Sequence, residues 1–552
     1  MCKAIFTLIT SALLIMFNQI YAQDTAVYWI PFKYKNTETH TISNPSTYLS
    51  PKAISRRLKY SIPIDSTDLP VSALFVAQIK ATGAEVMRTS KWLNGAVVYT
   101  TDSLQLVNIK SLPYVAFETK IQPRKIKRNT TRDSTKFVQT INEKQMYKYG
   151  QAQNQVQQLK LDCLHNLGYT GKGMTISILD GGFRNVDMLS AFDSLRAHNQ
   201  IKGVYDFVDM DNVVYDWSSD HGTMVLSCLA ANLPNQLIGT APDADYWLLR
   251  TEQGGSEYII EEYNWACGAE FADSVGTDLI NSSLGYTTYD DALTSHSYLD
   301  MNGTTCPSSK AAALAARKGI LVVNSMGNSG NNSWQFLGAP ADADSILSIG
   351  AVDENGIATG FSSYGPTSDN QPKPNTCARG LRAAIIQPGS GQVGTADGTS
   401  FSSPILCGAA ACLWQSLPNK NNIEILKIIE QNSHKYEMPD NKLGYGIADF
   451  CNSYYQQQPY GIVAANNNGI PTILPNPFNN SFSVIFEAQS TAPINIKIYD
   501  ANAKLIQQNT ETYTAGYIYK ISFDELQKTP AGFYFVDVTT DTNRYTLKAI
   551  KQ

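Results

Sequence analysis

The chain has 552 residues, of which 43% are hydrophobic and 16% are charged, and its formal net charge at pH 7 is −5. This length exceeds one ordinary domain, so we expect two or three domains with large apolar cores. The acidic net charge, with a dense basic stretch only at residues 124–132, argues against nucleic acid as a partner.

Residues 1–22 have the features of a secretory signal peptide. Lys3 precedes an apolar run over residues 4–17, and the small residue Ala22 stands at the expected cleavage point. No later segment of the sequence is long and apolar enough to predict a transmembrane segment. We therefore expect an exported protein.

Export permits disulfides, but the nine cysteines lack a closely spaced framework. Cys228, Cys407 and Cys412 stand in alanine-rich helical runs, where a small buried thiol is the usual role. The pairing that we suggest is Cys267 with Cys306. Zinc is not expected, because the sequence has no clustered Cys and His spacing.

Residues 23–122 alternate between strand and helix patterns, which is typical of a small α+β domain. We expect a helix over residues 71–82, a strand over 93–100, and a helix over 102–109 that leads into an edge strand at 112–118. Residues 123–149 are polar and basic and cannot form a core, so they are interpreted as a linker open to proteolytic nicking.

From residue 150 to 454 the pattern changes to continuous apolar runs separated by helical segments. The predicted strands are 174–179, 245–249, 278–282, 320–323 and 346–352, and the predicted helices are 223–231, 259–275 and 308–318. This alternation predicts an α/β fold with a doubly wound, mostly parallel sheet. Functional sites in such folds form at the carboxyl ends of the strands.

Residues 455–471 are a polar linker, and the last segment, 472–552, has an all-β pattern. Strands are expected near 481–486, 494–499, 517–523, 532–538 and 545–550. Their short, regular spacing predicts a small β-sandwich.

Ser400 follows a Gly-Thr lead-in and opens an apolar, alanine-rich helical run. At a helix N-terminus, unpaired backbone amides and the helix dipole favour the negative charge that develops in acyl transfer. A lone Gly-Thr-Ser is more often an ordinary helix cap. The catalytic interpretation therefore depends on a base and a carboxylate elsewhere in the chain.

Two residues in the parallel-sheet region supply these groups. Asp180 stands where an apolar strand ends, before two glycines that permit a sharp turn, although such aspartates are often only turn formers. His221 opens a helical run, a position expected to keep imidazole neutral and suited to a general base. The other histidines have polar contexts and receive no role.

An oxyanion donor is the fourth requirement of acyl transfer. Asn328 follows a predicted strand and lies between Gly327 and Gly330, although asparagine in a turn is usually structural. Asp180, His221 and Ser400 together fit a nucleophile activated by a base that a carboxylate orients.

With these residues in order, residues 150–452 resemble the subtilisin-like serine proteases, the subtilases. The matching motifs are Asp180-Gly-Gly, His221-Gly-Thr, Gly239-Thr-Ala-Pro242, Asn281-Ser-Ser-Leu-Gly285, Gly327-Asn-Ser-Gly330, Ile349-Gly-Ala-Val352, Phe361-Ser-Ser-Tyr-Gly365 and Gly398-Thr-Ser400. The resemblance implies a secreted serine endopeptidase in which Ser400 is the nucleophile, His221 the base and Asp180 the orienting carboxylate.

The resemblance also implies that Asn328 and the backbone N–H of Ser400 form an oxyanion hole. The substrate backbone would pair with the strand residues Ser282, Ser283, Leu284 and Gly285. Protein or peptide substrates follow from this, and the alternative is an inert surface-bound binding protein on the same scaffold.

Three departures from the family pattern stand out. Gly181 replaces a hydroxyl residue, Met224 replaces a common second histidine, and Phe401 with two serines follows the nucleophile. Residues 286–309 form a long polar insertion that we expect to shape the cleft. No cofactor is required, and structural calcium is common in relatives, but no contiguous oxygen-rich loop identifies a calcium site here.

The flanking domains complete the resemblance. The N-terminal domain resembles the inhibitor-type propeptide of secreted subtilases, which implies a zymogen, and the alternative is a domain of unknown role. Residues 472–552 resemble the C-terminal sorting domain of the type IX secretion system, which implies bacterial export or outer-surface attachment through that machinery. A carbohydrate-binding or partner-binding sandwich is the alternative.

Overall fold

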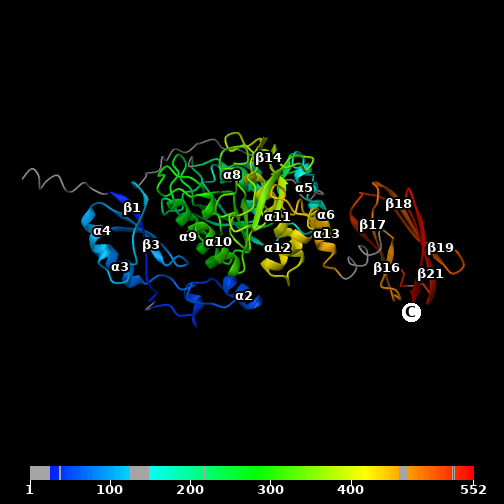
Figure 1. The fold of residues 1–552 in the computed structure, drawn as a ribbon. Coiled ribbons are helices and arrows are strands. Elements are labelled where there is room, and N and C mark those ends of the chain that lie inside the picture. Colours follow the sequence, from blue (N-terminus) through cyan, green and yellow to red (C-terminus); the bar gives the residue numbers. More distant parts are fainter. Residues whose placement is uncertain are drawn as a thin grey trace, which may run out of the picture.

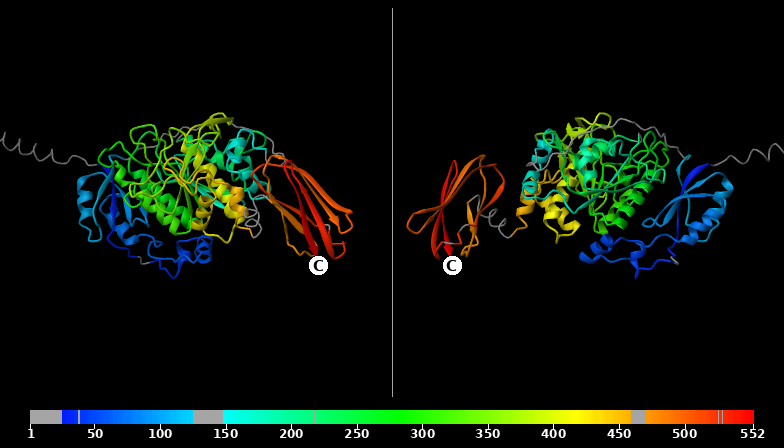
Figure 2. Two further views of the ribbon diagram at one scale, coloured as in Figure 1. Left: turned by 45° about the vertical axis from the view of Figure 1, so that its right-hand side comes forward. Right: turned by 180° about the vertical axis from the view of Figure 1, so that it is seen from behind.

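The computed structural model describes residues 25–36, 39–124, 148–216, 219–458, 470–524, 526–527 and 529–552. Three units follow one another along the chain, and Figures 1 and 2 show the N-terminal and C-terminal units on opposite sides of the central one. The predicted signal peptide, most of the predicted linker 123–149 and residues 459–469 of the second linker lie outside the described residues.

The N-terminal unit is a four-stranded sheet with two helices on one face. Its strand order is β2-β3-β1-β4, and the central strand β1 pairs antiparallel with both β3 and β4. The elements are β1 (Ala26–Pro31), β2 (Glu85–Ser90), β3 (Gly95–Thr100), β4 (Thr119–Gln122), α3 (Ala73–Ala81) and α4 (Ser103–Lys110). The predicted helices at 71–82 and 102–109 are confirmed.

The alternation of side chains along β1 gives this sheet two buried faces. Tyr28 and Ile30 pack with residues of α3 and α4, whereas Val27 and Trp29 pack against Tyr263 of the central unit. The Trp29 and Tyr263 rings are stacked with their centroids 4.6 Å apart. Because one face is closed by its own helices and the other by the central unit, the N-terminal unit shares a core with its neighbour.

The predicted edge strand at 112–118 is wrong. Residues 111–115 form a turn, Val115 makes only an isolated bridge to Phe32, and the edge strand is β4. Pro113 has no backbone N–H to give to a ladder. Tyr114 instead packs on the helix side, where its ring stacks on Phe75 at 3.8 Å and its hydroxyl donates to the Phe75 carbonyl.

The central unit is built on a seven-stranded sheet of order β13-β12-β11-β10-β5-β9-β6, with parallel pairing throughout. The strands are β5 (Thr175–Asp180), β6 (Ile201–Asp206), β9 (Asp245–Arg250), β10 (Leu279–Ser282), β11 (Leu321–Ser325), β12 (Leu347–Val352) and β13 (Thr376–Arg379). All five predicted strands are present. The two missed strands, β6 and β13, are the edges of the sheet.

Helices cover both faces of this sheet, as predicted. On one face, α8 (His221–Ala230) and α11 (Thr399–Ser416) pack over Ile176 and Ile178; on the other, α9 (Ile260–Val275) and α10 (Pro307–Arg317) pack over Leu179 and Ile280. The small residues of α11 permit close approach. A Cβ on Gly408 would lie 2.0 Å from Thr240 Oγ1.

One disulfide joins Cys163 on α6 (Leu161–Asn166) to Cys451 on α13 (Phe450–Tyr455), 288 residues apart. The suggested pairing of Cys267 with Cys306 is wrong, because both are buried free thiols. They face different neighbours. Cys267 Sγ donates to Thr89 O of the N-terminal unit at 3.5 Å, and Cys306 Sγ donates to Asp300 O at 3.6 Å. Cys228, Cys407 and Cys412 are buried thiols, as expected.

The C-terminal unit is a sandwich of two antiparallel sheets, of orders β16-β17-β20 and β19-β18-β21-β22. Its strands are β16 (Thr472–Leu474), β17 (Phe482–Glu487), β18 (Ala492–Asp500), β19 (Leu505–Tyr513), β20 (Ile518–Phe523), β21 (Gly532–Thr539) and β22 (Arg544–Lys551). One apolar cluster fills the space between the sheets. Among the described residues, no helix is both long and apolar enough to cross a membrane.

Candidate active site

Asp180 and His221 meet at the carboxyl end of the central sheet. Asp180 is the last residue of β5 and is fully buried, and His221 is the first residue of α8. His221 Nδ1 lies 2.9 Å from Asp180 Oδ1 and 3.0 Å from Oδ2, and the Gly181 amide donates to Oδ1 at 2.7 Å. The structure thus brings together the predicted base and carboxylate.

Small residues make this contact possible. A Cβ on Gly222 would lie 2.4 Å from Gly182 O and 3.0 Å from the Asp180 Cβ, and Gly182 has φ +150°. The missing side chain of Gly222 therefore permits the close approach of α8 to the end of β5, and Gly182 supplies the left-handed backbone of the turn that follows β5. In place of the hydroxyl residue expected from the family pattern, Gly181 offers the carboxylate its backbone amide.

Influences of opposite sign act on the pKa of His221. Burial lowers the pKa of His221, but the charge of Asp180 and the hydrogen bond to it outweigh burial and raise the pKa above its ordinary value. Asp180 thus counters the lowering of the pKa that burial produces, and the neutral imidazole required of a general base stays a prediction. The raised pKa means that Asp180 stabilises the imidazolium that forms when the base takes a proton.

Ser400 lies in the first turn of α11 and is 8% exposed. Its Oγ donates to Ser283 O at 3.3 Å, and its backbone carbonyl accepts from Ser283 Oγ at 2.8 Å. The second contact follows from Pro404, which lacks the N–H that would bond the Ser400 carbonyl within the helix. Ser283 therefore ties the strand edge to the nucleophile position.

Between Ser400 Oγ and His221 the described residues make no direct hydrogen bond. The imidazole nevertheless lies beside the start of α11, with its ring centroid 6.0 Å from that of Phe401. Such catalytic hydrogen bonds are often long or absent without substrate, and they form when the site closes on it. Ser400 Oγ is directed to Ser283 O instead.

Asn328 faces the same helix end. Its Oδ1 accepts from Thr399 N at 2.9 Å and from Thr399 Oγ1 at 3.0 Å, which directs Nδ2 away from Thr399. Nδ2 lies 3.4 Å from the position of a Cβ on Gly398. The side chain is thereby held with its amide donor toward the turn that delivers Ser400.

A cleft of about 580 Å³ opens beside His221. Its walls are Asp180, Gly181, Ser219, His221, residues 252–257, Ser283, Leu284, Gly285 and Asp290. Three of the four predicted substrate-binding residues line it. Ser282 does not, because it is fully buried and its Oγ accepts from Trp265 Nε1 at 2.9 Å on the other side of the strand.

Three acidic residues that the sequence motifs did not indicate, Glu252, Glu257 and Asp290, form one wall of this cleft. Asp290 belongs to the polar insertion 286–309, which we expected to shape the cleft. Its Oδ2 accepts from Glu257 N at 3.1 Å, so the insertion is joined to the loop that follows β9. The signal that was present is the stretch Thr-Glu-Gln-Gly-Gly-Ser-Glu directly after a buried strand.

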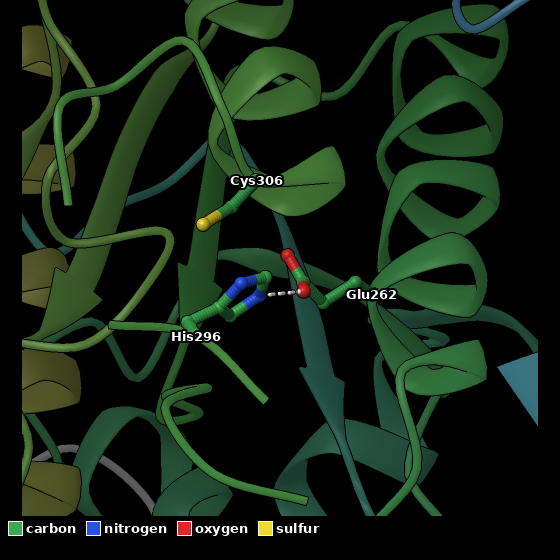
Figure 3. A group of neighbouring side chains, drawn as sticks. All are labelled: Glu262, His296 and Cys306. Carbon is green, nitrogen blue, oxygen red and sulfur yellow. Dashed lines mark hydrogen bonds and ion pairs between the residues drawn. The ribbon is translucent and has the colours of Figure 1, made fainter. Parts of the chain in front are cut away.

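Figure 3 shows a second cluster of titratable side chains, Glu262, His296 and Cys306. Glu262 is fully buried; its Oε1 accepts from Tyr289 OH at 2.7 Å and contacts His296 Nε2 at 2.5 Å, and its Oε2 accepts from the Ser308 hydroxyl at 2.6 Å. Burial lowers the pKa of His296, but Glu262 raises it above its ordinary value. The cluster fastens the insertion to α9.

Two histidines to which we assigned no role are largely enclosed, since 8% of the His296 side chain and 3% of His165 are exposed. His165 Nε2 contacts Thr240 O at 3.1 Å, and His165 Nδ1 contacts Tyr149 OH at 2.8 Å. Burial lowers the pKa of His165 to about 4. Both histidines make structural contacts, which the sequence pattern does not indicate because most of their partners come from distant segments.

The described residues contain two groups of three side chains close enough to hold a metal ion, and these are Glu262-His296-Cys306 and Glu252-Glu257-Glu261. The first is saturated by the donors to Glu262. Neither group alone supplies the roughly six to eight oxygens that calcium takes. Structural calcium therefore stays an expectation without an assigned site.

Three segments of the chain match known protein families. Residues 171–446 match the Subtilase family (Peptidase S8), residues 27–140 match the Peptidase S8 propeptide domain of Bacteroidota, and residues 472–552 match the secretion system C-terminal sorting domain. The chain belongs to the subtilase family. It is a subtilisin-type serine endopeptidase with a propeptide and a sorting domain that points to secretion or cell-surface attachment.

Curated relatives agree with this assignment. The chain is 27% identical to Subtilisin NAT of Bacillus subtilis subsp. natto over 415 residues, which is 73% of this chain and 93% of the relative. It is 29% identical to Subtilisin of Bacillus pumilus over 282 residues, or 50% of this chain and 90% of the relative. Nothing in these comparisons favours the inert alternative.

Solved structures with a similar fold include MycP1 from Mycobacterium smegmatis, at a TM-score of 0.45 and 19% identity, covering 60% of this chain and 90% of that one. A protease from Pseudoalteromonas arctica has a TM-score of 0.44 and 21% identity, covering 57% of this chain and 100% of that one.

Proposed function

We propose that Ser400, His221 and Asp180 carry out peptide-bond hydrolysis through an acyl-enzyme. His221 Nε2 takes the proton of Ser400 Oγ as that oxygen attacks the peptide carbonyl, and then gives the proton to the leaving amine. Water, activated by the same imidazole, releases the acyl group. The observation that supports this best is the 2.9 Å contact between His221 Nδ1 and the buried Asp180, which leaves Nε2 as the working nitrogen.

Asn328 Nδ2 and the Ser400 backbone amide are the proposed oxyanion donors. The contacts of Asn328 Oδ1 with Thr399 support this role, because they fix the amide before substrate arrives. Donors that are already oriented need no reorganisation when charge develops on the substrate oxygen.

The substrate backbone is proposed to pair with residues 283–285. Ser283 has a special position there, since its carbonyl accepts the Ser400 hydroxyl at 3.3 Å. A substrate strand that competes for this carbonyl would free Ser400 to turn toward His221. Binding and activation of the nucleophile would then be coupled.

The N-terminal domain is proposed to act as an inhibitor and folding aid, removed during maturation. In support, β4 ends at Gln122, and Gln122 lines a common cavity with Gln253 of the substrate cleft loop. The C-terminal domain is proposed to direct the exported protein through the secretion machinery of a bacterial envelope, after removal of the signal peptide at 1–22.

Mutation of Ser400 to alanine tests the catalytic assignment. Turnover of a casein-type substrate should fall about a million-fold, a magnitude known from subtilisin, a relative of this chain. Asn328→Ala should cost about a hundred- to a thousand-fold in kcat, again by the subtilisin precedent. Normal cleavage by the Ser400→Ala protein would refute the assignment.

A further inference from the structure

Four acidic side chains gather at one wall of the cleft. Glu252, Glu257 and Asp290 line it, and Glu261 lies behind them at the start of α9. Glu252, Glu257 and Glu261 each offer a carboxylate oxygen, and these oxygens all lie within 4.8 Å of one another. Like charges at such distances repel strongly unless a cation or protons compensate them.

Within the described residues, this wall has no basic partner. Burial is the largest influence on the pKa of each of the three glutamates. All the charged groups that act on these pKa values are other acids. Burial with these neighbours raises the pKa of Glu252 to about 8 and that of Glu257 to about 7. The fold thus holds the carboxyl groups together although their proximity and burial disfavour ionisation.

Glu261 adds a separate indication that a ligand belongs here. Only 1% of this residue is exposed; its Oε1 accepts from Gln253 N at 2.9 Å, but its buried Oε2 has no hydrogen-bond partner. A buried carboxylate oxygen without a donor is costly, and native structures usually satisfy such atoms. The missing donor is one that a cationic side chain can supply.

The position of the wall relates it to the substrate. The cleft that the acids line also contains His221 on one side and residues 283–285, the proposed substrate strand, on the other. A side chain of a bound peptide therefore reaches the wall close to the scissile bond. Arginine offers five N–H donors and lysine three, with a charge that compensates the carboxylates.

The chain itself carries the matching charge. Residues 124–132 contain Arg124, Lys125, Lys127, Arg128 and Arg132, and they begin two residues after β4 ends at Gln122. Gln122 and Gln253 line one cavity, so this basic stretch starts beside the loop that carries the acidic wall. The maturation segment and the cleft are complementary in charge.

We propose that Glu252, Glu257, Glu261 and Asp290 form a specificity subsite that selects a lysine or arginine side chain near the scissile bond. Its first ligand is the chain's own basic segment 124–132. This inference rests on the proposed catalytic function and adds the substrate class to it. The wall binds the basic side chain and takes no part in the chemical step.

The test uses the enzyme after its natural maturation and fluorogenic peptides that differ at one position. At each of four positions before the cleaved bond, lysine or arginine is compared with norleucine or glutamine. We expect kcat/KM to be about tenfold or more higher for the basic residue at one position, the effect of a charge-assisted hydrogen bond. Glu257→Gln and Glu252→Gln should each reduce that ratio several-fold.

Glu437→Gln is the matched control, because Glu437 is exposed and lies outside the cleft lining. It should keep the ratio. Equal kcat/KM for basic and neutral residues at every position would overturn the subsite. The same holds if Glu257→Gln and Glu252→Gln lower kcat/KM equally for basic and for neutral peptides. A calcium site would also overturn the proposed subsite. It would be shown if the Ser400→Ala protein binds calcium, if Glu257→Gln abolishes that binding, and if lysine peptides do not displace the calcium.

Failure of the subsite and failure of the catalytic assignment are distinguishable. An enzyme that reacts with a fluorophosphonate and cleaves peptides without basic preference refutes only the subsite. An enzyme that does not react refutes both.

Discussion

Each end of α9 carries a buried acid, Asp273 at the C-terminal end and Glu261 at the N-terminal end, and these two acids differ in whether a base neutralises them. At the C-terminal end, Asp273 contacts Arg57 Nη2 at 2.9 Å and Arg56 Nη2 at 2.6 Å, both from α2 (Pro51–Lys59) of the N-terminal domain. At the N-terminal end, Glu261 faces Glu252 and Glu257 without a basic partner among the described residues.

Helix electrostatics explain part of this contrast. The C-terminal end of a helix carries a partial negative charge, so Asp273 is unfavourable there without cations, whereas Glu261 gains from the positive N-terminal end. The N-terminal domain supplies the cations at one end as permanent partners. At the other end, a transient partner, the substrate, is the proposed source. Asp273 therefore holds the N-terminal domain in place, whereas Glu261 and its acidic neighbours are proposed to select a ligand.

Arg57→Ala removes a cation from the C-terminal end of α9, and we expect it to have the largest effect of the changes near the two ends of α9, a loss of stability of the N-terminal domain. Arg57 is 1% exposed and contacts both Asp273 and Asp68, so its loss removes one cationic partner of each buried carboxylate, at a cost of up to about 3–5 kcal/mol. In the full-length Ser400→Ala protein, hydrogen exchange in β1 should accelerate by more than about a hundredfold. Exchange in β18 should not change.

A surface ion pair of the same domain provides the control. Lys110 Nζ contacts Glu118 Oε1 at 2.6 Å, with 50% of the lysine side chain exposed. Lys110→Ala should therefore change protection by less than about 1 kcal/mol. Equal effects of the two substitutions would remove the distinction between buried and exposed partners.

The pH dependence of substrate preference tests the acids near the N-terminal end of α9, which have no basic partner among the described residues. The pKa of Glu252 is raised to about 8 and that of Glu257 to about 7, so both are largely protonated at pH 6 and ionised at pH 9. The groups that face them are Tyr286, Asp180, Glu262, Glu261 and Asp290. The ratio of kcat/KM for lysine and norleucine peptides should rise several-fold from pH 6 to pH 9, and a flat ratio would contradict this.

Stability gives the smallest of the expected effects. Because the folded pKa of Glu257 lies above its ordinary value, the native state binds the extra proton, and its contribution to stability is lost as pH rises through about 7. Glu257→Gln should therefore raise the melting temperature by a few degrees at pH 9 and change little at pH 4. A destabilised variant at pH 9 would mean that the charge is compensated after all.

The sequence was informative where a short segment determines its own geometry. Asp180 is predictable because a buried strand ends there before two glycines, and His221 because a helix begins at it. The edge strands β6 and β13 were missed, since an edge strand lacks the continuous apolar run of a central one. Ser282 and Ser283 point to opposite sides, as strand geometry requires.

Contacts between distant segments were not predictable in this way. Cys163 and Cys451 meet only because α6 and α13 pack together, and Arg57 reaches Asp273 across a domain boundary. The acidic wall likewise depends on the loop after β9, on α9 and on the insertion that carries Asp290. Each of these needs the folded arrangement of elements that the sequence pattern leaves open.

We propose that Ser400 is the activated nucleophile of this endopeptidase. Its most direct test is mass spectrometry of the processed protein after reaction with a fluorophosphonate. We predict one adduct per chain, on the peptide that contains Ser400, and none in the His221→Ala protein. An unreacted wild-type protein, or an adduct on another residue, would contradict the account.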